Sequence, residues 1–142
     1  MSFAFIRKRL SNLHWLPRRS SWNFLLGDRG ERVAARYLGR RGHRIIARNY
    51  RCKAGEIDLI CSHRDFIVFV EVKTRASIET EDPQEAVRAG QWARIERAAR
   101  YFLMQQSAED RPCRFDLVSV VWPSRGSPVV EHFEDVFQPR RL

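Results

Sequence analysis

Residues 66–74 read FIVFVEVKT, and this stretch sets the centre of the fold. Its first five residues are apolar on both faces that a β-strand presents, which is typical of a central strand covered on both sides. Glu71 and Lys73 then follow, two residues apart and therefore on one face. We expect a buried strand in the middle of a sheet, with charged side chains toward its end.

Helix and strand signals on either side of this strand predict the other elements. Gly42 is a helix stop, and Asp82, Pro83 and Glu85 are helix-start signals. The expected elements are a helix at 28–41, strands at 43–50, 56–62 and 66–74, a helix to about residue 106, and strands at 114–122 and 129–137.

The order α-β-β-β-α-β-β predicts the topology of the sheet. Strands joined by short turns pair in antiparallel fashion, whereas the third and fourth strands, joined through a helix, form a parallel pair with a right-handed crossover. The expected fold class is α/β (α+β), a central mixed five-stranded sheet flanked by helices.

The composition limits the kinds of protein that this chain represents. Its 142 residues suit one domain, and no run of eighteen apolar residues predicts a membrane span. The net charge of +9 favours a polyanionic partner, with nucleic acid ahead of an anionic membrane surface. Compositional bias is the alternative, because only three of the 26 basic residues are lysines. The scattered Cys52, Cys61 and Cys113 favour a reduced, cytoplasmic setting.

The N-terminal segment of the chain is strongly basic. Residues 1–26 carry five basic residues and no acidic one, and they predict a basic N-terminal extension ahead of a domain at 27–142. The extension either contacts nucleic acid, a membrane or the domain, or is dispensable.

Four charged residues interrupt two strands that are otherwise apolar. Glu56 and Asp58 share one face of strand 56–62, and Glu71 and Lys73 share one face of strand 66–74. If the short connection at residues 63–65 makes these two strands neighbours, the side chains of Asp58 and Glu71 lie close together. Two adjacent carboxylates repel, and Mg²⁺, which prefers oxygen ligands, relieves that repulsion and supports phosphodiester hydrolysis. Ordinary ion pairs are the alternative, with Lys73 bound to a carboxylate and Glu56 to an arginine of strand 43–50.

Other polar residues give weaker signals. A set of basic residues flanks the charged strands and either holds phosphates or forms a solvated rim: Arg48, Arg51, Lys53 and Arg75. The four histidines form no recognisable cluster in the sequence, and we assign them no role.

The pattern of Asp58 on one strand and Glu71-Val72-Lys73 on the next resembles the PD-(D/E)xK nucleases. The longer strings GERVAARYL, GHRIIARNYR, GEIDLI, FVEVKTR and RFDLVSV resemble the YraN-like family of small bacterial proteins over residues 27–122. That resemblance implies a restriction-endonuclease-like fold, similar to that of Holliday-junction resolvases.

The resemblance also implies roles for individual residues. Asp58 and Glu71 would bind Mg²⁺ or Mn²⁺, Lys73 would be the catalytic lysine, and Glu31 would face the site from its helix. Glu56 has no clear part in the motif. Gln91 stands where the family often has lysine, although related nucleases sometimes use glutamine there, so we class it as auxiliary.

Three functions follow as hypotheses. The leading one is a metal-dependent endonuclease acting on DNA, including branched or damaged DNA. The second is a nucleic-acid-binding protein that has the nuclease-like fold without turnover. The third is an adaptor that docks through its basic extension. Similar resolvases are dimers, which makes a homodimer a further hypothesis.

Overall fold

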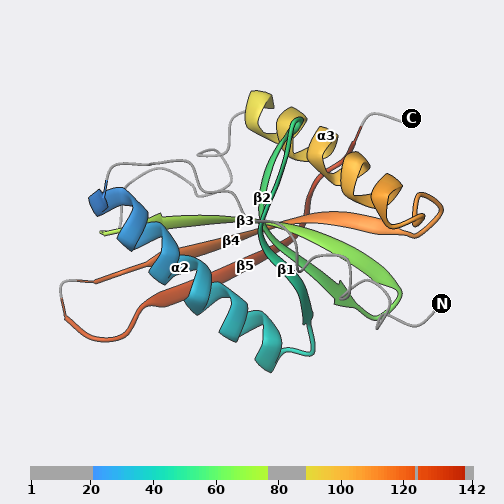
Figure 1. Cartoon of the computed structure of the whole chain (residues 1–142). Helices are drawn as coiled ribbons and strands as arrows, with labels where there is room; N and C mark the ends of the chain where they lie inside the picture. Colours follow the sequence, from blue (N-terminus) through green and yellow to red (C-terminus); the bar gives the residue numbers. More distant parts are fainter. Residues whose placement is uncertain (1–20, 77–88, 124, 140–142) are drawn as a thin grey trace.

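The computed structural model describes residues 21–76, 89–123 and 125–139 (Figure 1). Its elements are α2 (Ser21–Arg40), β1 (Arg44–Cys52), β2 (Gly55–His63), β3 (Phe66–Arg75), α3 (Ala89–Gln105), β4 (Cys113–Val121) and β5 (Val129–Phe137). The predicted order α-β-β-β-α-β-β is confirmed. The predicted helix-start signals at 82–85 and the basic extension up to residue 20 lie outside the described residues.

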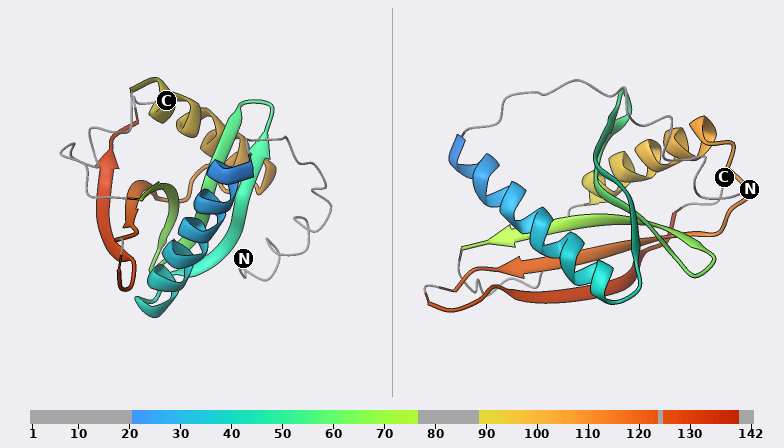
Figure 2. Two further views of the ribbon diagram at one scale, coloured as in Figure 1. Left: turned by 90° about the vertical axis from the view of Figure 1, so that its left-hand side faces the viewer. Right: turned by 60° about the horizontal axis from the view of Figure 1, so that its bottom comes forward.

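The five strands form one mixed sheet in the order β1-β2-β3-β4-β5. β3 and β4 run parallel, as the intervening helix predicts, and every other neighbouring pair is antiparallel. The helices cover opposite faces of this sheet, which is strongly curled (Figures 1 and 2). The predicted fold class is therefore confirmed.

β3 is the central strand of the sheet, and it is buried on both faces. Ile67, Val68, Phe69 and Val70 have no exposed surface. Phe69 packs under α3 against Phe102, with ring centroids 6.0 Å apart, while Val68 and Val70 face α2. Fully burying one such side chain contributes about 1.5–3 kcal/mol, so this strand holds the two layers together.

Helix α2 begins at Ser21, earlier than the predicted start at residue 28, and it runs across the domain boundary predicted between 26 and 27. Gly30 lies inside this helix, directly against Thr74 of β3: a Cβ at this position would lie 2.9 Å from the Thr74 Cβ. The glycine therefore allows a close approach of the helix to the sheet. The helix ends at Arg40, and Gly42 follows with a φ of 84°, as the predicted stop requires.

The β1–β2 hairpin leans onto the start of α3. Gly55 at its turn has a φ of 154°, and a Cβ there would lie 3.1 Å from the backbone oxygen of Arg94. A glycine is needed for both reasons. This contact brings the hairpin, α3 and the end of β3 around one polar hollow.

Candidate active site

The sheet divides at Asp58. β2 pairs with β3 only from Leu59 to His63, and the register would place Asp58 opposite Glu71. Instead of continuing the ladder, the Asp58 carboxylate accepts a hydrogen bond of 2.8 Å from the Val72 N–H. We call this point, formed by Asp58 with Glu71 and Val72, the strand fork. A side chain thus takes the place of a backbone acceptor, and the space between the strands opens.

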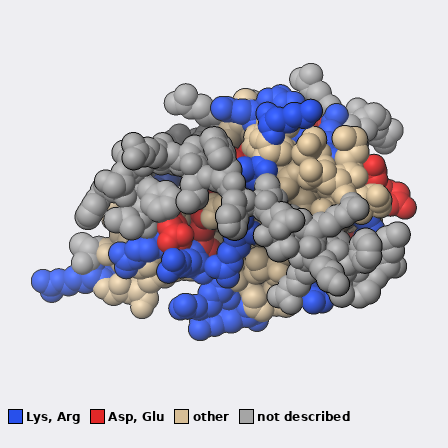
Figure 3. Space-filling model, viewed as in Figure 1, with Lys and Arg blue, Asp and Glu red and all other residues tan. Residues whose placement is uncertain are grey.

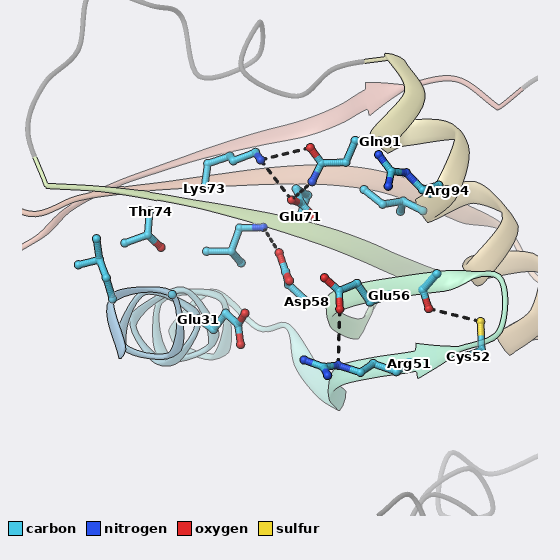
Figure 4. A pocket seen from close by; sticks show the side chains of 15 residues that line it. Glu31, Arg51, Cys52, Glu56, Asp58, Glu71, Lys73, Thr74, Gln91 and Arg94 are labelled. Carbon is cyan, nitrogen blue, oxygen red and sulfur yellow. Dashed lines mark hydrogen bonds and ion pairs between the residues drawn. The ribbon is translucent and has the colours of Figure 1, made fainter. Parts of the chain in front are cut away.

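Glu71 lies in the strand fork and has two partners (Figure 4). Its Oε1 accepts a hydrogen bond from the Gln91 amide nitrogen and lies 3.6 Å from the Lys73 ammonium nitrogen. Lys73 in turn donates to Gln91 Oε1 at 3.2 Å. Glu71, Gln91 and Lys73 therefore form a closed polar triangle between β3 and α3.

Burial raises the pKa of both carboxyl groups in the strand fork. Glu71 is only 7% exposed. Burial, followed by the neighbouring Asp58 carboxylate, raises the pKa of Glu71 to about 9. Burial also raises the pKa of Asp58, while the hydrogen bond from Val72 opposes that shift. A second ionised carboxylate is costly here unless a cation joins the pair.

The strand fork opens into a pocket of about 670 Å³. Glu31 of α2 lines it together with Asp58, Glu71, Lys73 and Gln91, so the structure brings all five of these predicted residues to one cavity. Glu31 comes from the middle of α2, next to Gly30. The near contact of that helix with β3 is what places a third carboxylate at the site.

The hairpin contributes a separate ion pair at the rim of the pocket. Arg51 Nε lies 3.5 Å from a Glu56 carboxylate oxygen, as the alternative reading of Glu56 predicts. Both residues line the pocket. Glu56 is thus held by β1 and does not belong to the polar triangle.

The remaining predicted basic residues lie elsewhere. Arg48, Lys53 and Arg75 are not part of the pocket lining, and the Lys53 ammonium nitrogen lies over the Tyr101 ring at 5.7 Å from its centroid. Arg94, which the sequence analysis missed, does line the pocket. Its signal was its place three residues after Gln91, which puts both side chains on one side of a helix.

The expectation that the histidines form no cluster is wrong for three of the four. The rings of His43 and His63 stack with centroids 4.0 Å apart, and the His132 ring lies 5.5 Å from that of His43. His43 follows α2, His63 ends β2 and His132 lies in β5, so only folding brings them together. His14 lies outside the described residues.

Within the parts of the chain that the structure describes, neither helix has the length and apolar character needed to cross a membrane.

Comparison with known proteins identifies the family. A UPF0102 protein of Chlorobium phaeobacteroides is 42% identical over 124 residues, covering 84% of this chain and 98% of its own length. One of Nitratidesulfovibrio vulgaris is 49% identical over 112 residues, covering 78% and 82%. One of Geotalea uraniireducens is 40% identical over 116 residues, covering 82% and 91%. The sequence model of the uncharacterised protein family UPF0102 matches residues 30–120, and the chain belongs to this family, the YraN-like family that it resembles.

Proposed function

We propose that the protein is a metal-dependent endonuclease that hydrolyses phosphodiester bonds in DNA, including branched or damaged DNA. The observation that carries this proposal is the strand fork. Asp58 and Glu71 meet where the ladder stops, with the Lys73 ammonium 3.6 Å from Glu71. Charged groups that are forced together in a pocket are typical of functional sites.

The residues of the strand fork fit a hard divalent cation. Asp58 and Glu71 offer carboxylate oxygens, and burial followed by the neighbouring Asp58 raises the pKa of Glu71, a cost that a bound cation would offset. Mg²⁺ or Mn²⁺ favours such oxygen ligands, and Glu31 lines the same pocket. When bound, the ion would supply Lewis-acid polarisation of a phosphodiester oxygen.

Lys73 is the residue best placed to orient an attacking water or to stabilise negative charge on the phosphate. Its ammonium has three donors, and Gln91 and Glu71 engage it at 3.2 and 3.6 Å. A further N–H direction is available to orient an attacking water or to stabilise negative charge that develops on the phosphate. Gln91 acts as a positioning residue, because it contacts both Glu71 and Lys73.

The surface charge supports a nucleic-acid substrate. On the face seen in Figure 3, basic side chains cover more of the described surface than acidic side chains, which form small patches. Arg51 and Arg94 line the pocket, whereas Arg48, Lys53 and Arg75 lie outside its lining. Such residues bind phosphates without reading sequence. A cytoplasmic location and a homodimer remain predictions.

A cleavage assay on single-stranded, duplex and four-way-junction DNA, with Mg²⁺ or Mn²⁺, tests this function. We expect cleavage by the wild type that EDTA stops, and a loss of at least about a hundredfold in Lys73→Ala, the size typical of a general acid–base or electrostatic group. Arg97→Ala is the matched control, because it removes one exposed cation outside the pocket. Undiminished cleavage by Lys73→Ala contradicts its assigned role.

A second candidate is a nucleic-acid-binding protein without turnover. The Gln91 side chain favours it, since its amide bridges Glu71 and Lys73 and competes for both. This alternative predicts binding that weakens steeply with salt and no cleavage with either metal.

A further inference from the structure

A second polar cluster lies just beyond the C-terminal end of α2, whereas the α2 residues that line the pocket are Leu26, Gly27 and Glu31. His43 follows the helix, His63 ends β2, and Arg114 and Asp116 belong to the RFD string that opens β4. His132 and Glu134 come from the neighbouring edge strand β5. The proposed nuclease function uses none of these residues.

Asp116 fixes the orientation of His132. Its side chain has no exposed surface, and its Oδ2 lies 2.8 Å from His132 Nε2. Asp116 also accepts hydrogen bonds from Arg114 and from the backbone N–H of Asp135. These charged and polar partners hold the pKa of Asp116 below its usual value, although burial opposes them, so the carboxylate is an acceptor and His132 Nε2 carries the proton. In neutral His132 the Nδ1 lone pair is therefore available.

Arg114 fixes the tautomer of His43 in the same way. Its Nη2 lies 3.3 Å from His43 Nε2, and because a guanidinium only donates, that nitrogen carries a lone pair. His43 is 5% exposed, and its buried Nδ1 has no hydrogen-bond partner among the described residues. The imidazole is neutral: burial and the adjacent His63 and His132 lower its pKa to about 4. The Nε2 lone pair that now faces Arg114 is the one that a metal ion would bind.

Glu134 completes a set of three ligands. One atom from each of His43, His132 and Glu134 lies within 4.8 Å of the others. The Arg114 guanidinium contacts two of these ligands: the same Nη2 that contacts His43 lies 3.5 Å from Glu134 Oε1. The cluster is therefore built around a positive charge that a side chain supplies.

We propose that His43, His132 and Glu134 form a binding site for a divalent transition-metal ion such as Zn²⁺, with the ion taking the place of Arg114 Nη2. Two imidazoles and one carboxylate suit Zn²⁺ or Co²⁺, with one coordination position left over for water. Asp116 is not a ligand itself; its hydrogen bond to His132 Nε2 orients that imidazole so that Nδ1 can bind the ion. This site goes beyond the proposed function and does not depend on it.

Modest movements would complete the coordination. Ligand atoms around a tetrahedral ion with bonds of 2.0–2.1 Å stand about 3.4 Å apart, so the set must contract from its present spacing. Glu134 is exposed and free to rotate inward. Because the guanidinium is planar, Arg114 Nη2 leaves only if the whole group moves, and its 3.2 Å hydrogen bond to Asp116 Oδ2 is then broken as well. The bound ion would then tie the chain after α2 to the edge strand β5.

The ligand chemistry separates this site from the strand fork. The strand fork offers carboxylates and suits Mg²⁺ or Mn²⁺, whereas imidazole nitrogen favours Zn²⁺ and Co²⁺. A metal that binds through His43 and His132 changes the ¹⁵N signals of their rings and gives Co²⁺ the strong visible absorption of tetrahedral nitrogen coordination. Binding at Asp58 and Glu71 changes neither ring.

The test is a Co²⁺ titration of the full chain, followed by visible absorption, with Zn²⁺ as competitor and imidazole ¹⁵N spectra recorded in parallel. We expect Glu134→Gln to weaken binding by at least about tenfold, in line with the loss of a group that supports a metal site. Glu131→Gln, an exposed change of equal charge on the same strand, should leave the affinity within about twofold.

Two further measurements decide between outcomes. The double variant Asp58→Asn/Glu71→Gln should keep the Co²⁺ absorption, because it alters only the strand fork. Absorption that disappears in that variant, or that Glu134→Gln leaves unchanged, would overturn the proposal. So would His43 and His132 signals that do not respond to saturating Zn²⁺. None of these outcomes bears on DNA cleavage, so the two proposals stand or fall separately.

Discussion

Replacing Gly30 tests whether the close packing of α2 on β3 sets the position of Glu31. A methyl group at this position would lie 2.8 Å from the Thr74 Cγ2 and 2.9 Å from its Cβ, and closer still to the hydroxyl oxygen. Thr74 is branched at Cβ and belongs to β3, so it has little freedom to withdraw. Gly30→Ala should therefore push α2 away from the sheet and carry Glu31 with it.

The magnitude follows from two opposing effects. Replacing a helical glycine by alanine stabilises a helix by about 1 kcal/mol, and overpacking a buried contact costs about 1–3 kcal/mol. Gly39→Ala in the same helix gives the first effect alone, because nothing lies within 4 Å of a Cβ there. The two variants should differ by about 1–3 kcal/mol in the free energy of unfolding, or roughly 3–10 °C in Tm.

Urea unfolding of both variants and of the wild type measures this difference. Adding Thr74→Ala to Gly30→Ala removes the hydroxyl and the Cγ2, so part of the loss should be recovered; a double-mutant cycle gives the coupling between the two positions. If Gly30→Ala proves as stable as Gly39→Ala, the close packing of α2 on β3 is refuted, and with it the reason given for the position of Glu31.

Three other substitutions or modifications test different parts of the molecule. Glu71→Gln should raise the free energy of unfolding in EDTA at pH 7 by about 1–3 kcal/mol, because Glu71, whose pKa burial raises to about 9, must take up a proton on folding at pH 7 and glutamine need not; urea unfolding that shows a decrease contradicts this. Tyr50→Phe should cost about 1 kcal/mol by the same measurement, because the Tyr50 hydroxyl donates to Gln105 Oε1 at 2.9 Å. Iodoacetamide at pH 8 should modify Cys52 well before Cys61, whose thiol is fully buried with its pKa raised to about 12; peptide mass spectra showing the reverse order would disprove it.

The sequence predicts the sheet well because its strongest signal is local. An apolar run such as FIVFV suits few positions other than a strand covered on both faces, and short turns leave few pairings for its neighbours. The convergence of Asp58 and Glu71 follows from the same period-two alternation. These features depend on nearby residues, and the structure reproduces them.

Features that depend on packing between distant segments escape prediction. The basic extension was predicted to reach residue 26, so the expected start of α2 at residue 28 is later than the observed start at Ser21; the contact of Gly30 with Thr74 is visible only in the fold. Arg94 reaches the pocket only because the hairpin turn at Gly55 leans on α3. The three clustered histidines are far apart in the sequence, and no spacing rule connects them.

The hydrogen bond from Val72 to Asp58 has a practical consequence for detecting ligands. An amide inside a strand ladder exchanges with deuterium when strands separate, but the Val72 amide exchanges when one side chain turns away. Its exchange rate and ¹⁵N chemical shift therefore respond to whatever the Asp58 carboxylate binds. The backbone of a residue with no chemical role becomes a reporter of occupancy, readable without substrate and without knowing what the substrate is.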